Sequence, residues 1–430
     1  MFTRGLFRTR DTQALRWKLA GVIVEASLAV QASINALSVS NRGLRAPSPL
    51  KPPPETSALV DAVGEEAAFQ KLEILAQQWG IQLRVLVDVS KGSYVSLGPS
   101  SDGNPSRQFV ASPPPQSQPH TQPYVQQHIW VALDAVDGTL KLCGLGNEPG
   151  RARMVNDGTW AIGLAMTEPT HKAMPEVCFG DFCVALILDG RPQSSSVHPG
   201  STEHPAGALA ISEGAQGGYV TYEICPHGAL TCDGLASLQQ QGLPCTNQSY
   251  SWLGPRLHTT SSAQLNQCFV YLDTFQAFDR RTHEPGDDKL APALYGRLMD
   301  RHNGGAFDVL RSYGNLSGLL STMLGWRGAN VMQTATTSAS GCSPEDSVQS
   351  WLEPQCGAFV VLNENLPNLI PSVPIILGAG GNAFHLKTGT DLRGWSLQDG
   401  RCSIAYTANA ILKLSLQKAV ELAAQDKAQT

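Results

Sequence analysis

The chain has few charged residues for its length and no excess of positive charge. Charged residues make up 16% of its 430 positions, and 31 Lys and Arg residues stand against 36 Asp and Glu residues, for a formal net charge of −5. A protein that binds nucleic acid through the phosphate backbone needs clustered Lys and Arg. The balance argues against a nucleic-acid partner, and the 42% hydrophobic content is that of an ordinary globular protein.

The sequence also lacks an uninterrupted hydrophobic run that could span a bilayer. The longest candidate, Leu19 to Leu37, is broken by polar residues and is predicted to be an amphipathic helix, so no membrane span is expected. No signal peptide is visible, whereas Arg4, Arg8 and Arg10 precede the first acidic residue, as in organellar transit peptides. We expect a cytoplasmic or organellar protein (chloroplast or mitochondrial matrix) that is not secreted, with residues 1–12 as a transit segment or a disordered N-terminus.

Paired cysteines and several common catalytic motifs are missing as well. Ten cysteines are spread along the chain without a Cys-x-x-Cys pair, which favours reduced thiols over a disulfide framework. Cys225, His227 and Cys232 lie close together in sequence, but their spacing matches no standard zinc site. No Gly-x-Ser-x-Gly, His-Glu-x-x-His or complete Gly-x-Gly-x-x-Gly occurs. Serine-hydrolase, zinc-protease and dinucleotide-binding sites therefore lack support.

Hydrophobic periodicity predicts both helices and strands. Apolar residues recur at helical spacing in residues 12–40, 57–79 and 408–424, so these segments are predicted to be helices. Alternation of apolar and polar residues over 83–89 predicts a half-exposed strand that carries Asp88 at its end. Further strands are predicted at 160–167 and 182–188.

Two stretches that are poor in apolar residues divide this pattern. Residues 98–127 are rich in Pro, Ser and Gln, which predicts a disordered surface insertion. A loop of Ser, Pro and His at 194–205 separates the chain into an N-terminal half, 13–205, and a C-terminal half, 206–430.

The segment from Trp130 to Thr139 carries the strongest chemical signal. Its apolar residues predict a buried strand ending at Asp134, and Asp137 follows three residues later, directly before Gly138. Two carboxylates and a backbone carbonyl could face one Mg²⁺ ion, which commonly shares its ligands with a substrate phosphate. If Gly138 and Thr139 also open a helix, their N–H groups would bind an anion beside the metal. Taken alone, the two aspartates are more typical of a solvated turn.

The order of these motifs resembles the inositol monophosphatase superfamily of Mg²⁺-dependent, lithium-sensitive phosphatases. Its Asp-Pro-Ile-Asp-Gly-Thr hallmark stands here as Asp134-Ala135-Val136-Asp137-Gly138-Thr139. The segments 156–160 and 311–315 are also similar to the family, and the resemblance covers roughly residues 14 to 420. It implies an α/β (α+β) fold with layers in the order αβαβα, two mixed or antiparallel sheets and helix pairs. The metal site would lie between the two halves, with the substrate pocket in the second.

The resemblance also implies roles for individual residues. The reaction would be hydrolysis of a phosphomonoester by metal-activated water, with Thr139 and Asp88 as catalytic residues. Asp88 matches the family's order for the first metal ligand. Glu65, in Gly64-Glu65-Glu66, is the alternative ligand, but it falls within a predicted helix, where two solvated glutamates are the simpler interpretation. The implied Mg²⁺ ligands are Asp88, Asp134, the Val136 carbonyl, Asp137 and Glu353, and the implied phosphate and substrate contacts are Gly138, Thr139, Asn330 and Thr334.

Several departures from the family pattern leave two functions open. Ala135 replaces the turn proline, and Asp88 and Glu353 each exchange one acidic residue for the other. The stretch 328–334 lacks the carboxylate with which inositol-specific members bind hydroxyl groups. The substrate is therefore expected to be a small phosphorylated polyol, sugar or nucleotide. The alternative is a weakened or inactive protein that keeps the fold as a binding or assembly module. Family members are often dimers, so a homodimer is an expectation.

Overall fold

The computed structural model describes fourteen segments of the chain, and every structural statement below refers to them. They are residues 12–51, 55–86, 93–99, 105–110, 127–143, 160–190, 207–213, 218–224, 253–262, 264–273, 290–312, 315–324, 356–397 and 401–429.

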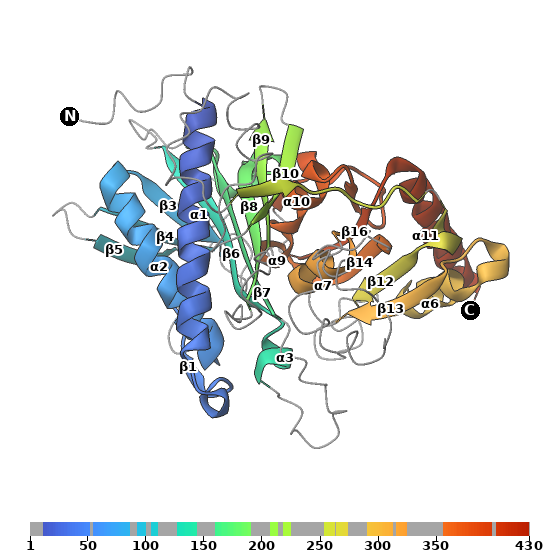
Figure 1. Cartoon of the computed structure of the whole chain (residues 1–430), viewed down its shortest axis with the longest axis horizontal. Coiled ribbons are helices and arrows are strands. Elements are labelled where there is room, and N and C mark those ends of the chain that lie inside the picture. The colour runs from blue at the N-terminus through green and yellow to red at the C-terminus, as the bar shows by residue number, and fades with distance from the viewer. Residues whose placement is uncertain are drawn as a thin grey trace, which may run out of the picture.

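Helices and sheets alternate in layers across the molecule (Figure 1). A helix pair covers the outer face of a large sheet, short helices separate the large sheet from a small sheet, and a second helix pair covers the small sheet. This order is the αβαβα arrangement that the resemblance to the phosphatase family implies. The outer pairs are α1 (Thr12–Asn35) with α2 (Leu59–Trp79) and α6 (Leu290–Met299) with α11 (Ala410–Gln429), and the middle helices are α7 (Asn315–Thr322), α9 (Leu366–Leu369) and α10 (Ser372–Gly378).

The first helix pair forms where the sequence predicts it. By length and composition α1 could cross a membrane, but it packs against α2 and the large sheet, and Trp17, Ile23 and Val30 on it are buried in the core. In this structure α1 is therefore a core helix. Its partner α2 ends at Gly80, whose φ of 60° suits the left-handed position that closes a helix.

The large sheet has nine described strands in the order β11-β10-β9-β8-β7-β6-β3-β4-β5. Of its described pairs, β3 with β6 is parallel and the others are antiparallel. The strands are β3 (Gln82–Leu86), β4 (Tyr94–Pro99), β5 (Pro105–Val110), β6 (His128–Asp137), β7 (Ala161–Thr167), β8 (Phe182–Asp189), β9 (Gly207–Glu213), β10 (Gly218–Ile224) and β11 (Leu253–Arg256).

The small sheet follows later in the chain and is mixed. Its order is β13-β12-β14-β16-β15, with β12 parallel to β13 and β14 and the remaining described pairs antiparallel. The strands are β12 (Phe269–Asp273), β13 (Asp308–Ser312), β14 (Cys356–Asn365), β15 (Asn382–His385) and β16 (Arg401–Thr407).

Short elements complete the described fold. Strands β1 (Arg45–Pro47) and β2 (Thr56–Ala58) form an antiparallel ribbon before α2. The remaining short helices are α3 (Thr139–Cys143), η1 (Val39–Asn41), η2 (Met174–Glu176), η3 (Phe179–Asp181), η4 (Leu265–Gln267), η5 (Arg301–Asn303) and η7 (Leu392–Gly394).

The structure corrects part of the prediction of disorder for residues 98–127, and β4 already runs to Pro99. Residues 105–110 form β5, which pairs along its whole length with β4. Arg107 on β5 also makes ion pairs with Glu66 and Glu73 of α2. Backbone pairing and surface ion pairs thus order a segment whose composition offers few apolar residues. Strands β9, β10 and β11, which follow residue 205 in the chain, extend the large sheet.

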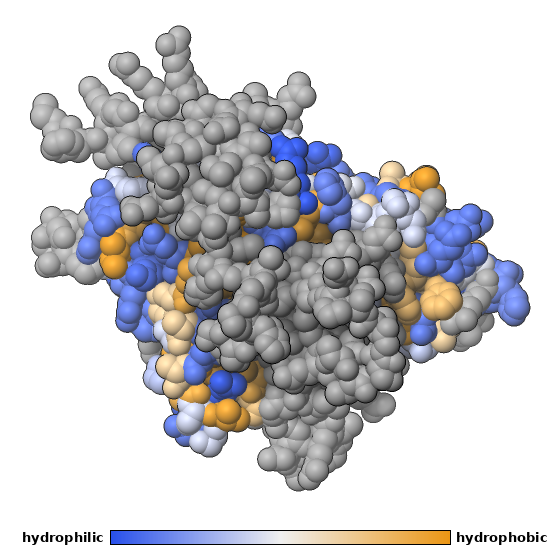
Figure 2. Space-filling view, viewed as in Figure 1, coloured by the Kyte–Doolittle hydropathy of each residue, from blue (hydrophilic) through white to orange (hydrophobic). Residues whose placement is uncertain are grey.

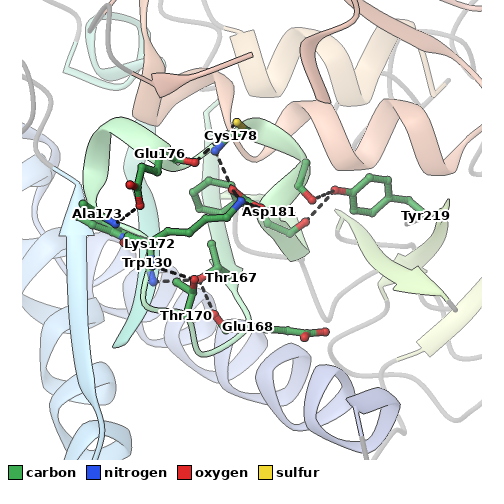
Figure 3. Close-up of polar contacts among 12 residues, drawn as sticks. Trp130, Thr167, Glu168, Thr170, Lys172, Ala173, Glu176, Cys178, Asp181 and Tyr219 are labelled. Carbon is green, nitrogen blue, oxygen red and sulfur yellow. Dashed lines mark hydrogen bonds and ion pairs between the residues drawn. The ribbon is translucent and has the colours of Figure 1, made fainter. Parts of the chain in front are cut away.

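The connection between β7 and β8 satisfies its own polar groups (Figure 3). The Lys172 ammonium lies 2.7 Å and 2.9 Å from the two carboxylate oxygens of Asp181. Asp181 also accepts the Cys178 N–H at 2.8 Å, and Glu176 accepts the Ala173 N–H at 3.1 Å. The backbone carbonyl of Lys172 accepts the indole N–H of Trp130 at 3.0 Å, which fixes the connection to β6.

Candidate active site

The acidic turn, Asp134 to Thr139, lies at the end of β6, where it contacts α2 of the outer helix pair through Thr139 and α7 of the middle layer through Asp137. β6 does not end at Asp134 as predicted but continues to Asp137, with a shift in its pairing to β7 between these two residues. Asp134 accepts the Val136 N–H at 3.2 Å within this irregular stretch. Gly138 then turns the chain with a φ of 93°, and α3 begins at Thr139. The predicted turn and helix start are therefore confirmed.

Asp137 joins the acidic turn to the C-terminal half. Its side chain is buried, and its Oδ2 accepts the Leu316 N–H at 2.8 Å, the Ser317 N–H at 3.0 Å and the Ser317 hydroxyl at 3.3 Å. These donors belong to the first turn of α7, where a carboxylate interacts favourably with the helix dipole. Gly163 of β7 permits the approach, because a Cβ there would lie 2.3 Å from the Leu316 side chain.

Thr139 forms the second connection, to Asp61 in the first turn of α2. The Thr139 hydroxyl oxygen lies 2.8 Å from Asp61 Oδ1 and 2.9 Å from the Val136 carbonyl oxygen. Burial raises the pKa of Asp61 from 3.8 to about 6, although the Thr139 hydrogen bond and the charge of Lys51 oppose the rise. The hydroxyl has one proton for two acceptors. Above about pH 6 the ionised Asp61 competes for it, and below that pH the protonated Asp61 can itself donate to Thr139.

Sequence reasoning missed Asp61. An acid in the first turn of a helix is common because it complements the helix dipole. The one indication in the sequence is that Asp61 stands among the apolar residues Leu59, Val60 and Val63, which suggests a buried carboxyl. Its contact with Thr139 joins residues that are 78 positions apart in the chain.

The structure brings together five of the predicted site residues. Asp134, Val136, Asp137, Gly138 and Thr139 share the acidic turn. The other predicted site residues lie outside the described segments: Asp88, Asn330, Thr334 and Glu353.

The predicted solvation of Glu65 is wrong, whereas Glu66 does lie at the surface. Glu65 is buried and accepts the Ser48 hydroxyl. Neighbouring Gly64 packs closely on both α1 and the acidic turn, since an added Cβ would lie 3.0 Å from Ile34 and 3.2 Å from Ala135. Glu66, one position further around the helix, pairs with Arg107.

The acidic turn carries oxygen atoms of the kind that bind Mg²⁺. Among the described residues, no group of three or more His, Cys, Asp and Glu side chains is placed to hold a metal ion. Two carboxylates and the Val136 carbonyl are oxygen donors of the type that Mg²⁺ prefers. The Val136 carbonyl and Asp137 Oδ2 already accept hydrogen bonds from Thr139 and α7. The donor type therefore fits Mg²⁺, and further ligands would have to come from the predicted Asp88 and Glu353.

Comparison with known proteins finds relatives in structure only. No family model matches the sequence, and no curated protein is significantly similar to it. The holo form of Leishmania major fructose-1,6-bisphosphatase superposes with a TM-score of 0.51 at 9% identity, covering 98% of this chain and 96% of that chain. Its apo form gives a TM-score of 0.50 at 9% identity, covering 97% and 96%. An inositol monophosphatase from Zymomonas mobilis gives 0.43 at 13% identity, covering 96% and 100%.

At these identities the likeness is one of fold. The bisphosphatase matches span nearly the whole of both chains, so the similarity includes both sheets and the helices between them. The chain therefore shares the layered fold of fructose-1,6-bisphosphatase.

Proposed function

We propose that the protein is a Mg²⁺-dependent phosphomonoester hydrolase that acts on a small phosphorylated polyol, sugar or nucleotide. The observation that carries the proposal is the hydrogen bond between Thr139 and Asp61 beside the two carboxylates of the acidic turn. A buried carboxyl whose pKa is about 6 is suited to accept a proton near neutral pH. The phosphatase fold in which this pair occurs supports the same reaction class.

The residues present can move a proton and hold the two halves together. Ionised Asp61 accepts the proton of the Thr139 hydroxyl, and Thr139 in turn takes a proton from the water that attacks phosphorus. The phosphorus–oxygen bond to the leaving group then breaks, and the leaving oxygen is protonated by solvent. Asp137 meanwhile holds the first turn of α7 against the acidic turn.

In this proposal Mg²⁺ binds at the acidic turn. Asp134, the Val136 carbonyl and Asp137 would hold Mg²⁺ together with the predicted ligands Asp88 and Glu353. When bound, the ion would neutralise charge on the phosphoryl oxygens and lower the pKa of the attacking water.

Release of inorganic phosphate tests this proposal. The panel contains inositol phosphates, sugar phosphates and 3′-phosphoadenosine nucleotides, each with and without millimolar Mg²⁺. We expect Mg²⁺-dependent release from at least one substrate, and a decrease of about 100-fold or more in Asp61→Asn and Thr139→Val, since general acid–base catalysis typically contributes that much. Asp181→Asn is the matched control, because Asp181 is an acid in the β7–β8 connection.

One observation favours a second function, that of a non-catalytic binding or assembly module. Asp137 Oδ2 and the Val136 carbonyl, both predicted metal ligands, accept hydrogen bonds within the chain. Absence of phosphate release from every substrate, together with no rise in melting temperature on addition of Mg²⁺, would establish this alternative against the enzyme.

A further inference from the structure

Arg84 of β3 lies on the face of the large sheet that is turned away from α1 and α2. Its neighbours Leu83 and Val85 belong to the core under these two helices, and side chains alternate between the two faces of a strand. Its pairing partner on β6 is Trp130, which is fully buried in the core that the large sheet shares with the small sheet. The Arg84 side chain is only half-buried, so part of it is open to solvent.

Two aromatic rings hold the guanidinium of Arg84. Its Cζ atom lies 5.1 Å from the centre of the Tyr94 ring and 5.4 Å from the centre of the Trp130 ring. The two rings meet edge to face, with 5.2 Å between their centres, and Tyr94 comes from the neighbouring strand β4. Contacts of this kind attract the cation and leave the N–H groups at the edge of the guanidinium for other partners.

Hydrogen bonds within the chain use little of the donor capacity of Arg84. A guanidinium has five N–H donors. Nε of Arg84 lies 3.4 Å from the side-chain oxygen of Gln82, which makes a long hydrogen bond. Nη1 lies 3.2 Å from His128 Nε2, but Nε2 also lies 2.9 Å from the Lys172 carbonyl oxygen, which can only accept. His128 Nε2 therefore carries a proton and cannot accept one from Arg84.

The charge of Arg84 is also uncompensated in the part of the chain that the structure describes. The ion pairs among those residues do not include Arg84, and they join the other arginines to acids: Arg16 to Glu168, Arg107 to Glu66 and Glu73, Arg297 to Asp426, and Arg393 to Asp391. Burial lowers the pKa of the Arg84 guanidinium, and Tyr94 opposes the fall. An anion at the open edge of the guanidinium would supply both the missing charge and the missing acceptors.

Arg84 lies far from the acidic turn. Its partner Trp130 precedes Asp137 by seven positions on β6, which corresponds to roughly 23 Å at about 3.3 Å per residue. The β7–β8 connection borders this region, since the Lys172 carbonyl accepts the indole N–H of Trp130 at 3.0 Å (Figure 3). A ligand at Arg84 would therefore leave the site of the proposed hydrolysis free.

We propose that Arg84 binds a small oxyanion, a phosphate or a carboxylate, at a site separate from the acidic turn. This inference goes beyond the proposed function and does not depend on it. The guanidinium would form paired hydrogen bonds to two oxygens of the anion, while Tyr94 and Trp130 hold its plane in position. A lysine at this position would bind the same anion less tightly, because an ammonium group lacks the planar pair of donors.

Thermal unfolding with added anions tests the proposal. The probes are inorganic phosphate and acetate in buffer without Mg²⁺, and sodium chloride at the same ionic strength is the reference. The melting temperature of the wild type should rise in a saturable way with at least one probe, and the probe that binds more tightly identifies the source of the oxyanion. Arg84→Gln should weaken this binding about tenfold or more, the size of effect typical of a lost charged hydrogen bond. Arg84→Lys should weaken it less.

The matched control is Arg107→Gln on β5. Arg107 also lies over an aromatic ring, with its Cζ atom 5.3 Å from the centre of the Phe69 ring, but it is paired with Glu66 and Glu73. These pairs lie on α2, where Figure 2 shows hydrophilic residues at the surface. Because Arg107 already has its counter-charges, this variant should bind the anion as the wild type does.

The comparison of these variants can overturn the proposal in several ways. It is wrong if neither probe gives a saturable rise, if Arg84→Gln responds as the wild type does, or if Arg84→Gln and Arg107→Gln weaken binding alike. Binding that survives Arg84→Gln and is lost in Thr139→Val would place the anion at the acidic turn instead. Unfolding without anion checks that each variant is folded, and Arg84→Lys decides if Arg84→Gln is not. No turnover is measured, so failure of the proposed function would not affect the result.

Discussion

Charged groups are paired in one connection of the molecule and unpaired or buried beside another. In the β7–β8 connection, Lys172 and Asp181 pair with each other and Glu176 accepts a backbone N–H. Beside the α1–α2 connection, Arg42 keeps a buried donor unbonded and Asp61 holds its proton up to about pH 6. The paired charges of the β7–β8 connection stabilise that loop. The unbonded donor of Arg42 and the buried carboxyl of Asp61 instead lower the stability of the folded protein. Such a departure is characteristic of functional sites.

Of these variants, Asp61→Asn is expected to change the free energy of unfolding most. The pKa of Asp61 is raised from 3.8 to about 6 in the folded protein, so the folded state binds the proton more tightly than the unfolded state. Its contribution to stability is complete below about pH 3.8 and is lost as the pH rises through about 6. Because asparagine does not titrate, Asp61→Asn should be more stable than the wild type at pH 8 by roughly 2–3 kcal/mol, at about 1.4 kcal/mol per pKa unit.

Urea unfolding of the wild type and of Asp61→Asn between pH 4 and pH 8 measures the difference in their free energies of unfolding. The free-energy gap should open between pH 4 and pH 7 and then stay constant. A gap that is absent at pH 8, or that has the opposite sign, would show that the buried carboxylate is stabilised by its neighbours. Asp61 would then resemble the paired charges of the β7–β8 connection.

The second prediction concerns Asp181→Asn, which should make the protein less stable, whereas Asp61→Asn should make it more stable at pH 8. Lys172 and Asp181 keep 44% and 26% of their side-chain surface exposed, and such pairs contribute up to about 1 kcal/mol. The variant should lose about 0.5–1 kcal/mol at pH 8, because the ion pair and the charged acceptor for Cys178 are both weakened. A double-mutant cycle with Lys172→Met isolates the pair. A coupling energy of zero would assign the loss to the Cys178 hydrogen bond instead.

Local sequence patterns predicted the elements whose apolar faces are long and regular. The helices α1, α2 and α11 and the strands β7 and β8 lie where periodicity predicts them. The layer order was also predictable, because the acidic turn and its neighbours occur in the order found in a known fold. These features depend on residues that are close together in the sequence.

The remaining features depend on contacts between distant residues. β5 is ordered by backbone pairing to β4, which leaves no periodic signature in a short, polar segment. The proposed role of Asp61 follows from the position of Thr139, and buried Glu65 has its partner Ser48 in the connection before α2. Composition and spacing do not encode which face of a helix meets a turn from another part of the chain.

The smallest effect is expected from Glu66→Gln, and its neighbour provides the comparison. Glu66 lies at the surface and its pKa is lowered by the Arg107 hydrogen bond, so its contribution is present above pH 4.5 and is lost as the pH falls. Removing it should cost about 0.5 kcal/mol or less, since Arg107 keeps its second partner Glu73 and exposed pairs are weak.

Adjacent Glu65 should behave differently under the same measurement. Its buried carboxyl accepts the Ser48 hydroxyl, so Glu65→Leu should cost about 1–3 kcal/mol, because the hydroxyl loses its acceptor. In 1 M salt, where screening acts over about 3 Å, the cost of Glu66→Gln should vanish and that of Glu65→Leu should remain. Equal costs at both positions, or a cost of Glu65→Leu that salt removes, would mean that burial does not distinguish the two glutamates.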